Sequence, residues 1–252
     1  MDFKGWFRTQ DGERIDPLTM TDACSRYLLR CQAVSKTDTA AVRSICEAAF
    51  RKYGLPRAIR SDNGAPFASR AVAGLSRLAL DWIKLGIVAE RIEPGHPEQN
   101  GRHERMHRTL KAETATPPAA NRRRQQQAFD RFRREYNEER PHEALGQRPP
   151  NAVYRASPRP YPERVPEPDY DSHMLVRRVY PHGQFFCKNQ HVFLSKVLAG
   201  ERIALQPFDD RYWCVYFAAL PIAYFDSAEL LTGNLPEASI AGDGNLEAGY
   251  LP

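Results

Sequence analysis

A proline-rich stretch divides the chain into two parts. Residues 155–170, RASPRPYPERVPEPDY, hold five prolines in sixteen positions and have no apolar periodicity. Because proline fixes φ and lacks a backbone donor, such a stretch forms an extended spacer and cannot continue a helix or a central strand. The sequence therefore predicts folded parts at 1–154 and 171–232, a Pro-rich linker at 155–170, and a flexible tail at 233–252.

Strand and helix patterns alternate in the first part. Three runs rich in apolar residues are separated by turn signals such as Asp11-Gly12 and predict an antiparallel meander over 2–7, 13–20 and 26–34. The periodicity that follows predicts a helix between the cap at Thr37-Asp38 and Gly54, a strand at 57–62, a helix near 75–85, a strand at 86–92, and helices near 100–113 and 121–139. These elements predict an α/β fold, a mixed five-stranded sheet flanked by helices.

The second part has the spacing of a small all-β domain. Its apolar runs are short, rich in β-branched and aromatic residues, and separated by Gly, Asn or Asp. They cover 174–180, 184–188, 191–195, 201–208, 212–217 and 222–226. Such spacing predicts a small antiparallel β-barrel domain.

Positive charge is confined to the first part. Residues 1–154 hold 27 Lys and Arg against 19 Asp and Glu, a net +8, whereas residues 155–252 hold 9 against 12, a net −3. The predicted helices at 102–140 carry 11 basic residues, nearly all arginine, against 6 acidic ones. Arginine suits phosphate, so this stretch favours a polyanionic partner; an ordinary solvated surface is the alternative.

Cysteine and hydropathy patterns favour an intracellular protein. Five cysteines are widely spaced without a C-x-x-C pair, so neither a disulfide framework nor a zinc knuckle is expected, and the thiols should be buried. No apolar run approaches the ~18 to 20 residues that cross a bilayer, and no signal peptide is recognisable. We expect a cytoplasmic location without membrane association.

One stretch supports two kinds of metal chemistry. The segment His103-Glu104-Arg105-Met106-His107 fits H-E-x-x-H, in which two histidines hold zinc and the glutamate acts as a general base. Flanking arginines disfavour a second cation there. The zinc metallopeptidase is therefore the least favoured interpretation, and both histidines are then expected to be surface residues or, less favoured, DNA contacts.

Aspartates at strand ends offer a different site. Asp62 ends a predicted strand in RSDNGAPF, where Asn63-Gly64 favours a sharp turn. Ligands bind at such edges of open α/β sheets, and carboxylates suit hard divalent cations. A turn aspartate without further function is the alternative. Asp2 on the first predicted strand is a second candidate, and Asp22 ranks lower because it could merely end a turn.

Five sequence blocks occur in an order that resembles a known family. They are DFKG at 2–5, TDACSRYLL at 21–29, RSDNGAPF at 60–67, HPEQNGRHERMHRTLK at 96–111 and YNEERPHEALGQRPP at 136–150. Together they resemble the catalytic core of bacterial insertion-sequence transposases related to retroviral integrases, over residues 2 to about 154. Each block alone is weak, but the ordered combination is specific.

The resemblance implies a ribonuclease-H-like fold with an Asp, Asp, Glu triad at Asp2, Asp62 and Glu104. In the family the triad holds two Mg²⁺ or Mn²⁺ ions, and the enzyme processes DNA 3′ ends and joins them to target DNA as an oligomer on double-stranded DNA. On the predicted helix, Arg108 and Lys111 share the face of Glu104 and Arg105 follows it. The predicted DNA contacts are Arg105, Arg108, Lys111, Arg122, Arg123 and Arg124.

Departures from the family pattern leave an alternative open. Members usually carry a half-strand before the first aspartate and helix-turn-helix segments upstream, and the sequence opens at Met1-Asp2. The alternative expectation is an N-terminally truncated, catalytically poor remnant that still binds DNA through its basic helices. The second domain also resembles the small barrel that follows the core in such transposases.

Overall fold

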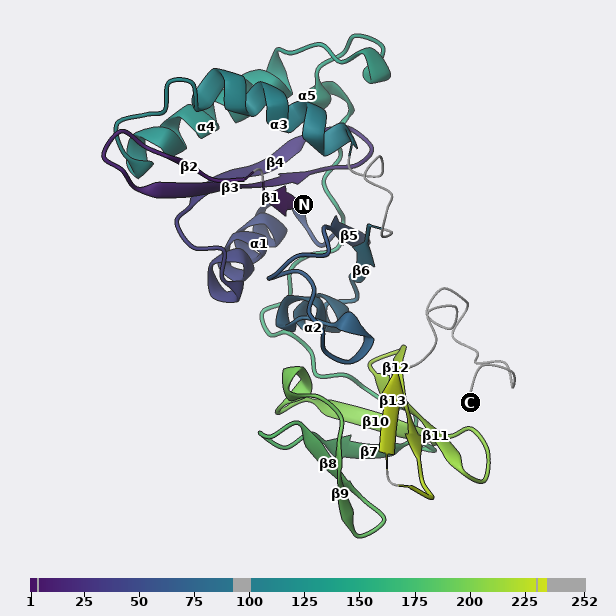
Figure 1. Cartoon of the computed structure of the whole chain (residues 1–252). Helices are drawn as coiled ribbons and strands as arrows, with labels where there is room; N and C mark the ends of the chain where they lie inside the picture. The colour runs from purple at the N-terminus through teal and green to yellow at the C-terminus, as the bar shows by residue number, and fades with distance from the viewer. Residues whose placement is uncertain (4, 93–100, 230, 235–252) are drawn as a thin grey trace. The chain divides into compact units, whose positions relative to one another are not determined.

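The computed structural model describes residues 1–3, 5–92, 101–229 and 231–234. Residues 4, 93–100, 230 and 235–252, which include nearly all of the predicted tail at 233–252, lie outside this description. The chain divides into two compact units, each described by itself (Figure 1). Unit 1 is Met1–Pro66 with Ile87–Glu163, and unit 2 is Phe67–Gly86 with the chain from Arg164 onward.

The sheet of unit 1 is built around one long strand. Strand β3 (Arg14–Thr21) pairs antiparallel with β1 (Asp2–Phe3), β2 (Phe7–Arg8) and β4 (Leu28–Val34). The predicted strand at 2–7 is split because Gly5 adopts a φ of 88°, which L-residues rarely tolerate. Strands β5 (Ala58–Ser61) and β6 (Val88–Arg91) form a parallel pair. The Met1 nitrogen donates to the Arg60 carbonyl at 2.7 Å, which links the start of β1 to β5.

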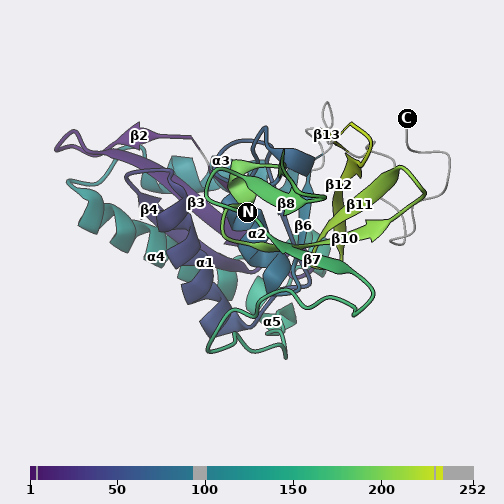
Figure 2. The same ribbon diagram turned by 90° about the horizontal axis from the view of Figure 1, so that it is seen from below.

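Helices cover both faces of this sheet. Helices α3 (Gly101–Thr114) and α4 (Arg122–Glu138) lie on one face and α1 (Thr39–Tyr53) lies on the other (Figure 1); Figure 2 views the unit from the α1 side. A short helix α5 (Pro150–Val153) follows. Asp38, within the predicted cap, accepts from the Ala41 amide at 2.8 Å, and Asn121 caps α4 by accepting from the Arg124 amide at 3.0 Å.

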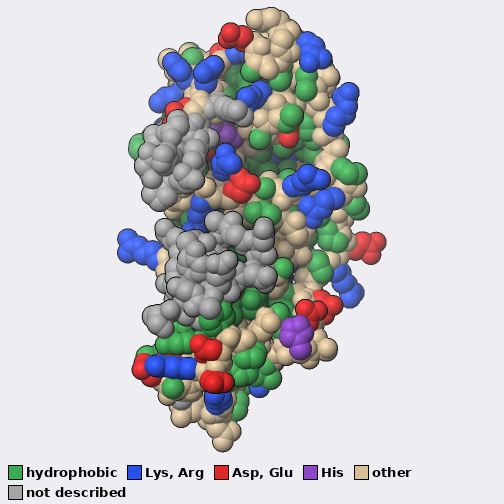
Figure 3. All heavy atoms as spheres, turned by 90° about the vertical axis from the view of Figure 1, so that its right-hand side faces the viewer, with side chains coloured by type: hydrophobic (Ala, Val, Ile, Leu, Met, Phe, Trp, Pro, Cys, Tyr) green, Lys and Arg blue, Asp and Glu red, His purple; other side chains and the backbone are tan. Residues whose placement is uncertain are grey.

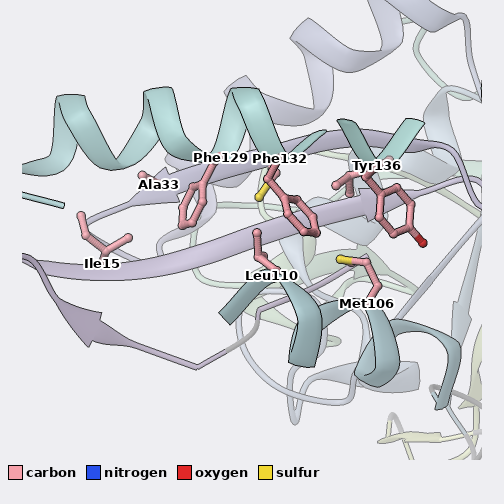
Figure 4. Packing of buried hydrophobic residues seen from close by; sticks show 9 residues of the cluster. Ile15, Ala33, Met106, Leu110, Phe129, Phe132 and Tyr136 are labelled. Carbon is pink, nitrogen blue, oxygen red and sulfur yellow. The ribbon is translucent and has the colours of Figure 1, made fainter. Parts of the chain in front are cut away.

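The main core of unit 1 lies between the sheet and the α3–α4 pair (Figure 4). Met106 and Leu110 of α3 pack in one cluster with Phe129 and Phe132 of α4. Residues of β3 and β4, among them Ile15 and Ala33, complete this cluster. Full burial of each such side chain contributes roughly 1.5–3 kcal/mol. This packing holds α3 in a fixed rotation, so its opposite face is turned outward.

Helix α4 also satisfies the outer edge of β4. Asn137 accepts from the Leu28 amide at 2.8 Å and donates to the Leu28 carbonyl at 3.0 Å. Gln126 repeats this pattern, accepting from the Ala33 amide at 2.8 Å and donating to the Cys31 carbonyl at 3.0 Å. The two side-chain amides therefore pair with backbone groups of β4 that a neighbouring strand would otherwise bind.

The first half of the predicted linker packs against unit 1. Leu55 donates its amide to the Arg159 carbonyl at 2.7 Å, and the Ser157 amide donates to the Tyr53 carbonyl at 2.9 Å. Gly54, with a φ of 80°, lies so close to the Ser157 carbonyl that a Cβ would collide with it. The sequence predicted a spacer here. In the structure, backbone hydrogen bonds to residues at the end of α1 and just after it hold this segment in place.

Unit 2 contains an antiparallel sheet in the order β13–β12–β11–β10–β7. The strands are β7 (Leu175–Arg178), β10 (Arg202–Pro207), β11 (Tyr212–Phe217), β12 (Leu220–Asp226) and β13 (Leu231–Asn234), with a separate hairpin of β8 (Gln184–Cys187) and β9 (Gln190–Phe193). Within the described residues no backbone ladder closes this sheet into the predicted barrel. Side-chain bonds join the hairpin to both sheet edges, from Arg177 Nε to the Phe186 carbonyl (2.9 Å) and from Thr232 Oγ1 to the Phe193 carbonyl (2.7 Å).

Helix α2 (Arg77–Lys84) belongs to unit 2, although the sequence placed it in the first part. Glu201, 7% exposed, accepts from Lys84 at 2.9 Å and pairs with Arg77 at 3.0 Å. A carboxylate as buried as Glu201 is stabilised by both cations, so this cluster holds α2 within unit 2.

Four of the five cysteines are buried as predicted, and Cys24 is exposed. None of the helices in the described ranges is long and apolar enough to cross a membrane.

Asn137→Ala is expected to lower the free energy of unfolding of unit 1 by about 2–4 kcal/mol, because both polar groups of Leu28 lose their partner. Chemical denaturation followed by circular dichroism measures this loss. Gln127→Ala, an exposed amide on the same helix, serves as the control and should change stability by less than about 0.5 kcal/mol. Equal effects of the two substitutions would contradict the edge-satisfying role of Asn137.

Candidate active site

Asp2 is presented by β1, a two-residue strand at the edge of the four-stranded sheet of unit 1. It pairs in register with Thr19 of β3, and its side chain is 13% exposed. The neighbouring Met1 nitrogen donates to the Arg60 carbonyl of β5. The carboxylate thus lies where β1 meets both the antiparallel and the parallel parts of the sheet.

Asp62 directly follows β5 and begins a turn. The Gly64 amide donates to its Oδ1 at 3.3 Å, and the Asn63 side chain donates to the Ile92 carbonyl beyond β6 at 2.8 Å. The turn is therefore held to the next strand of the parallel pair. Burial raises the pKa of Asp62, while the Gly64 amide and the Met1 amine act in the opposite direction.

The Met1 amine indicates that the two aspartates lie in one region. Burial lowers the pKa of this amine to about 6, and the charges of Asp2 and Asp62 both oppose that shift. Asp2 follows Met1 in the chain and Asp62 lies two residues after Arg60, whose carbonyl accepts from the Met1 nitrogen, so both aspartates lie on stretches that this hydrogen bond joins. The structure therefore brings the two predicted aspartates together at adjacent strand ends.

Helix α3 separates buried and exposed residues sharply. Met106, His107 and Leu110 are buried, whereas the residues predicted to act on DNA or metal are exposed. The exposed set is Glu104, Arg105, Arg108 and Lys111. Glu104 thus lies on an exposed side of the helix together with three cations, and Glu113 near the end of the helix is exposed as well; the roles of these residues stay predictions.

The two histidines of the H-E-x-x-H segment face the sheet, not solvent. His107 is 2% exposed, and its Nε2 lies 2.6 Å from Thr19 Oγ1. His103 is partly buried beside Thr21, and burial lowers its pKa to about 2, with smaller contributions from the Met1 amine and His107. The expectation that both are surface residues was wrong. Because His107 Nε2 already contacts Thr19, the segment also does not present a zinc-binding pair.

The sequence contained a signal for the buried histidine. His103, His107, Leu110 and Thr114 recur at helical spacing, which predicts one buried face. The same histidines also fit the zinc motif, so the segment carries two patterns, and the helical periodicity is the one that matches their burial.

Arg122, Arg123 and Arg124 form the exposed first turn of α4. Arg122 Nε lies 3.4 Å from the Glu13 carboxylate, an exposed pair that contributes little to stability. In the space-filling view, Lys and Arg side chains are frequent in the upper part of the molecule, with isolated acidic side chains among them (Figure 3).

Asp22, the lower-ranked candidate, serves a turn. Its Oδ2 accepts from the Ser25 amide at 2.7 Å and from the Ser25 hydroxyl at 2.6 Å, between β3 and β4. These bonds account for the residue without further chemistry.

The donor chemistry of the site suits a hard cation. Asp2 and Asp62 supply oxygen ligands in a partly buried place, and a desolvated carboxylate favours a nearby positive charge. The described residues contain no group of three or more His, Cys, Asp or Glu positioned to hold a metal ion. Glu104 as third ligand therefore stays a prediction, as do the roles of both aspartates.

Comparisons with known proteins match the same part of the chain. Two family models, both described as integrase core domain, match residues 1–97 and 85–150. A Pol polyprotein of Feline endogenous virus ECE1 is 35% identical over 100 residues, which are 39% of this chain and 9% of that protein. An uncharacterized 39.2 kDa protein of insertion element IS476 from Xanthomonas euvesicatoria is 30% identical over 148 residues, 56% of this chain and 39% of that protein.

A solved structure shares the fold at low identity. It is a simian T-cell lymphotropic virus intasome in complex with PP2A regulatory subunit B56 gamma, 16% identical, with a TM-score of 0.50 over 86% of this chain and 75% of that chain. The fold of unit 1 is the mixed α/β, ribonuclease-H-like fold of integrase cores. The matched stretches span less than half the length of the curated relatives. Through residues 1–150, more than half of its length, this chain belongs to the integrase core domain family.

Proposed function

We propose that the chain is a transposase or integrase that performs DNA 3′-end processing and strand transfer by two-metal phosphoryl transfer. The observation that carries this proposal is the hydrogen bond from the Met1 nitrogen to the Arg60 carbonyl, which joins the strand of Asp2 to the strand before Asp62 in an integrase-core fold. Helix α3 adds a carboxylate on an outward face that is otherwise cationic. Its substrates are the double-stranded ends of a mobile element and a target duplex, in the cytoplasm.

Asp2, Asp62 and Glu104 would hold two Mg²⁺ or Mn²⁺ ions. When bound, such ions activate the attacking hydroxyl and stabilise the leaving oxygen. The protein's own contribution is to hold the carboxylates on rigid elements: β1 in register with β3, the tethered turn after β5, and α3 packed on the core. Burial raises the pKa of Asp62, and a cation bound there would oppose this shift by stabilising the charged carboxylate.

The arginines and the lysine of the outward faces would hold the DNA. Arg105, Arg108 and Lys111 follow Glu104 on α3, and Arg122, Arg123 and Arg124 open α4. Guanidinium groups bind phosphate in a fixed geometry, which positions a duplex without reading its sequence. We further propose that the chain acts as a homo-oligomer on DNA, and that the β8–β9 hairpin completes a small barrel in unit 2.

A second candidate is a catalytically poor protein that binds DNA through the same faces. It is favoured by the lack of a three-ligand metal group among the described residues. Strand transfer and DNA binding distinguish the two candidates, because only the first predicts a product.

Glu104→Gln is expected to reduce strand transfer between element-end oligonucleotides and a target duplex by at least ~10³-fold, since it removes a charge from the proposed metal site. Gel analysis of joined products with Mg²⁺ or Mn²⁺ measures this. Glu113→Gln, an exposed carboxylate on the same helix, is the matched control and should stay within about 3-fold. Products that survive Glu104→Gln or Asp62→Asn at the wild-type level would refute the triad; no product from any variant, with duplex binding retained, would favour the second candidate.

Arg108→Ala and Lys111→Ala are each expected to weaken duplex binding at every sequence alike and to reduce the slope of log affinity against log salt by about 1. Fluorescence anisotropy over a salt series measures both. Arg51→Ala, on α1 at the opposite face of the sheet, is the control for lost positive charge. If Arg51→Ala lowers the slope as much as Lys111→Ala does, the assignment of the DNA to the α3 face is wrong.

The stability contribution of Asp62 is expected to fall as pH rises, because burial raises its pKa in the folded protein above the ordinary value of 3.8. The folded state binds the proton more tightly, so the contribution is full below 3.8 and is lost as pH rises through the raised pKa. Urea unfolding over a pH series should show wild type losing stability relative to Asp62→Asn in that window, and Mg²⁺ should reverse the trend. A parallel pH dependence of the two proteins would contradict the raised pKa.

A further inference from the structure

Two histidines on α3 meet two threonines on β3. His107 Nε2 lies 2.6 Å from Thr19 Oγ1, and both ring nitrogens of His103 lie 3.4 Å from Thr21 Oγ1. Residues four apart on a helix rise by about 6 Å and residues two apart on a strand by about 6.8 Å, so the two pairs match in spacing. The match sets the position of α3 along β3.

His107 also reaches the first aspartate. Its Nδ1 lies 3.8 Å from Asp2 Oδ2, and Thr19 pairs with Asp2 in the sheet register. The Thr19 hydroxyl lies 3.3 Å from the Asp2 carbonyl. Asp2, Thr19 and His107 therefore form one closed, mostly buried group in which the ring lies between the hydroxyl and the carboxylate.

The two ring contacts favour one proton arrangement. The Thr19 hydroxyl has one proton, and its contact with Nε2 (2.6 Å) is shorter than its contact with the Asp2 carbonyl (3.3 Å). Donation of that proton to Nε2 leaves the ring N–H on Nδ1, on the side of the Asp2 carboxylate. With the opposite tautomer, a lone pair would face the carboxylate. In this arrangement the ring N–H points toward the Asp2 carboxylate, 3.8 Å away.

We propose that His107 is a positioning residue, which orients the Asp2 carboxylate for metal binding and ties the helix that carries Glu104 to the strand that carries Asp2. Such support has a clear need here, because Asp2 lies on a strand of two residues that Gly5 ends. Groups that hydrogen-bond to metal ligands fix their direction, and their loss weakens metal binding. The inference rests on the proposed metal site at Asp2.

Two amide substitutions separate the contacts of the ring. In His107→Asn, the side-chain amide nitrogen takes the place of Nδ1 and keeps a donor toward Asp2. In His107→Gln, the amide reaches the place of Nε2, which keeps the Thr19 contact and loses the donor toward Asp2. The affinity of the full chain for Mn²⁺, measured from the electron paramagnetic resonance signal of the unbound ion, is the readout, and circular dichroism checks folding.

We expect His107→Gln to weaken Mn²⁺ binding by about 10- to 100-fold and His107→Asn to stay within about 3-fold of wild type. Wild-type affinity in His107→Gln, or equal losses in both variants, would overturn the proposal, because equal losses indicate packing alone. Should His107→Gln fail to fold, Thr19→Val removes the hydroxyl that orients the ring and should weaken binding in the same direction; unchanged binding would then overturn it.

Asp2→Asn distinguishes a failure of this inference from a failure of the proposed function. Wild-type binding that Asp2→Asn leaves unchanged, or no Mn²⁺ binding at all, refutes the metal site itself. The contact can then be tested without metal by unfolding Asp2→Asn, His107→Gln and the double variant. The double variant should lose less than the two single losses together, because the first substitution already breaks the shared contact; additive losses would overturn the proposal.

Discussion

The proposed metal site depends on the packing of α3 against β3. Met106 and Leu110 are packed between β3 and α4, and His107 is buried against Thr19 of the same strand. A helix held this way cannot rotate without exposing apolar area at roughly 25 cal/mol per Å² and leaving a buried imidazole unpaired. Its outward residues therefore keep a fixed direction, although their own side chains make few internal contacts.

The remaining part of the site depends on strand ends. Asp2 and Asp62 come from strands far apart in sequence, and the Met1 nitrogen, bonded to the Arg60 carbonyl, lies close to both carboxylates. Bringing two carboxylates together in a partly buried place raises the free energy of the folded state unless a cation is present. Burial raises the pKa of Asp62 in this place, a shift that a nearby positive charge would oppose.

Local patterns predicted the elements of unit 1 well, because caps and periodicity are local properties. The Asp38 and Asn121 caps and the buried stripe of α1 all act within a few residues. The split of the first strand at Gly5 could not be predicted, since a glycine permits a positive φ without requiring one. Contacts over long sequence distances were also missed: Glu201 fixes α2 within unit 2, and Ser157 and Arg159 hold the first half of the linker.

The roles of the site residues stay predictions. Asp2, Asp62 and Glu104 came from strand ends, turn chemistry and an ordered set of motifs, and the structure places the two aspartates in one region. The contact of His107 with Thr19 was missed because the two residues are 88 positions apart in the sequence, which no local pattern indicates. A histidine in an H-E-x-x-H segment suggests metal binding, but the direction in which it points depends on which single face of the helix is buried. Once Met106 and Leu110 require that stripe to face the sheet, the histidine one turn before Leu110 must lie inside and Glu104 outside. The apolar residues of the segment therefore decide which of its polar residues can reach a substrate.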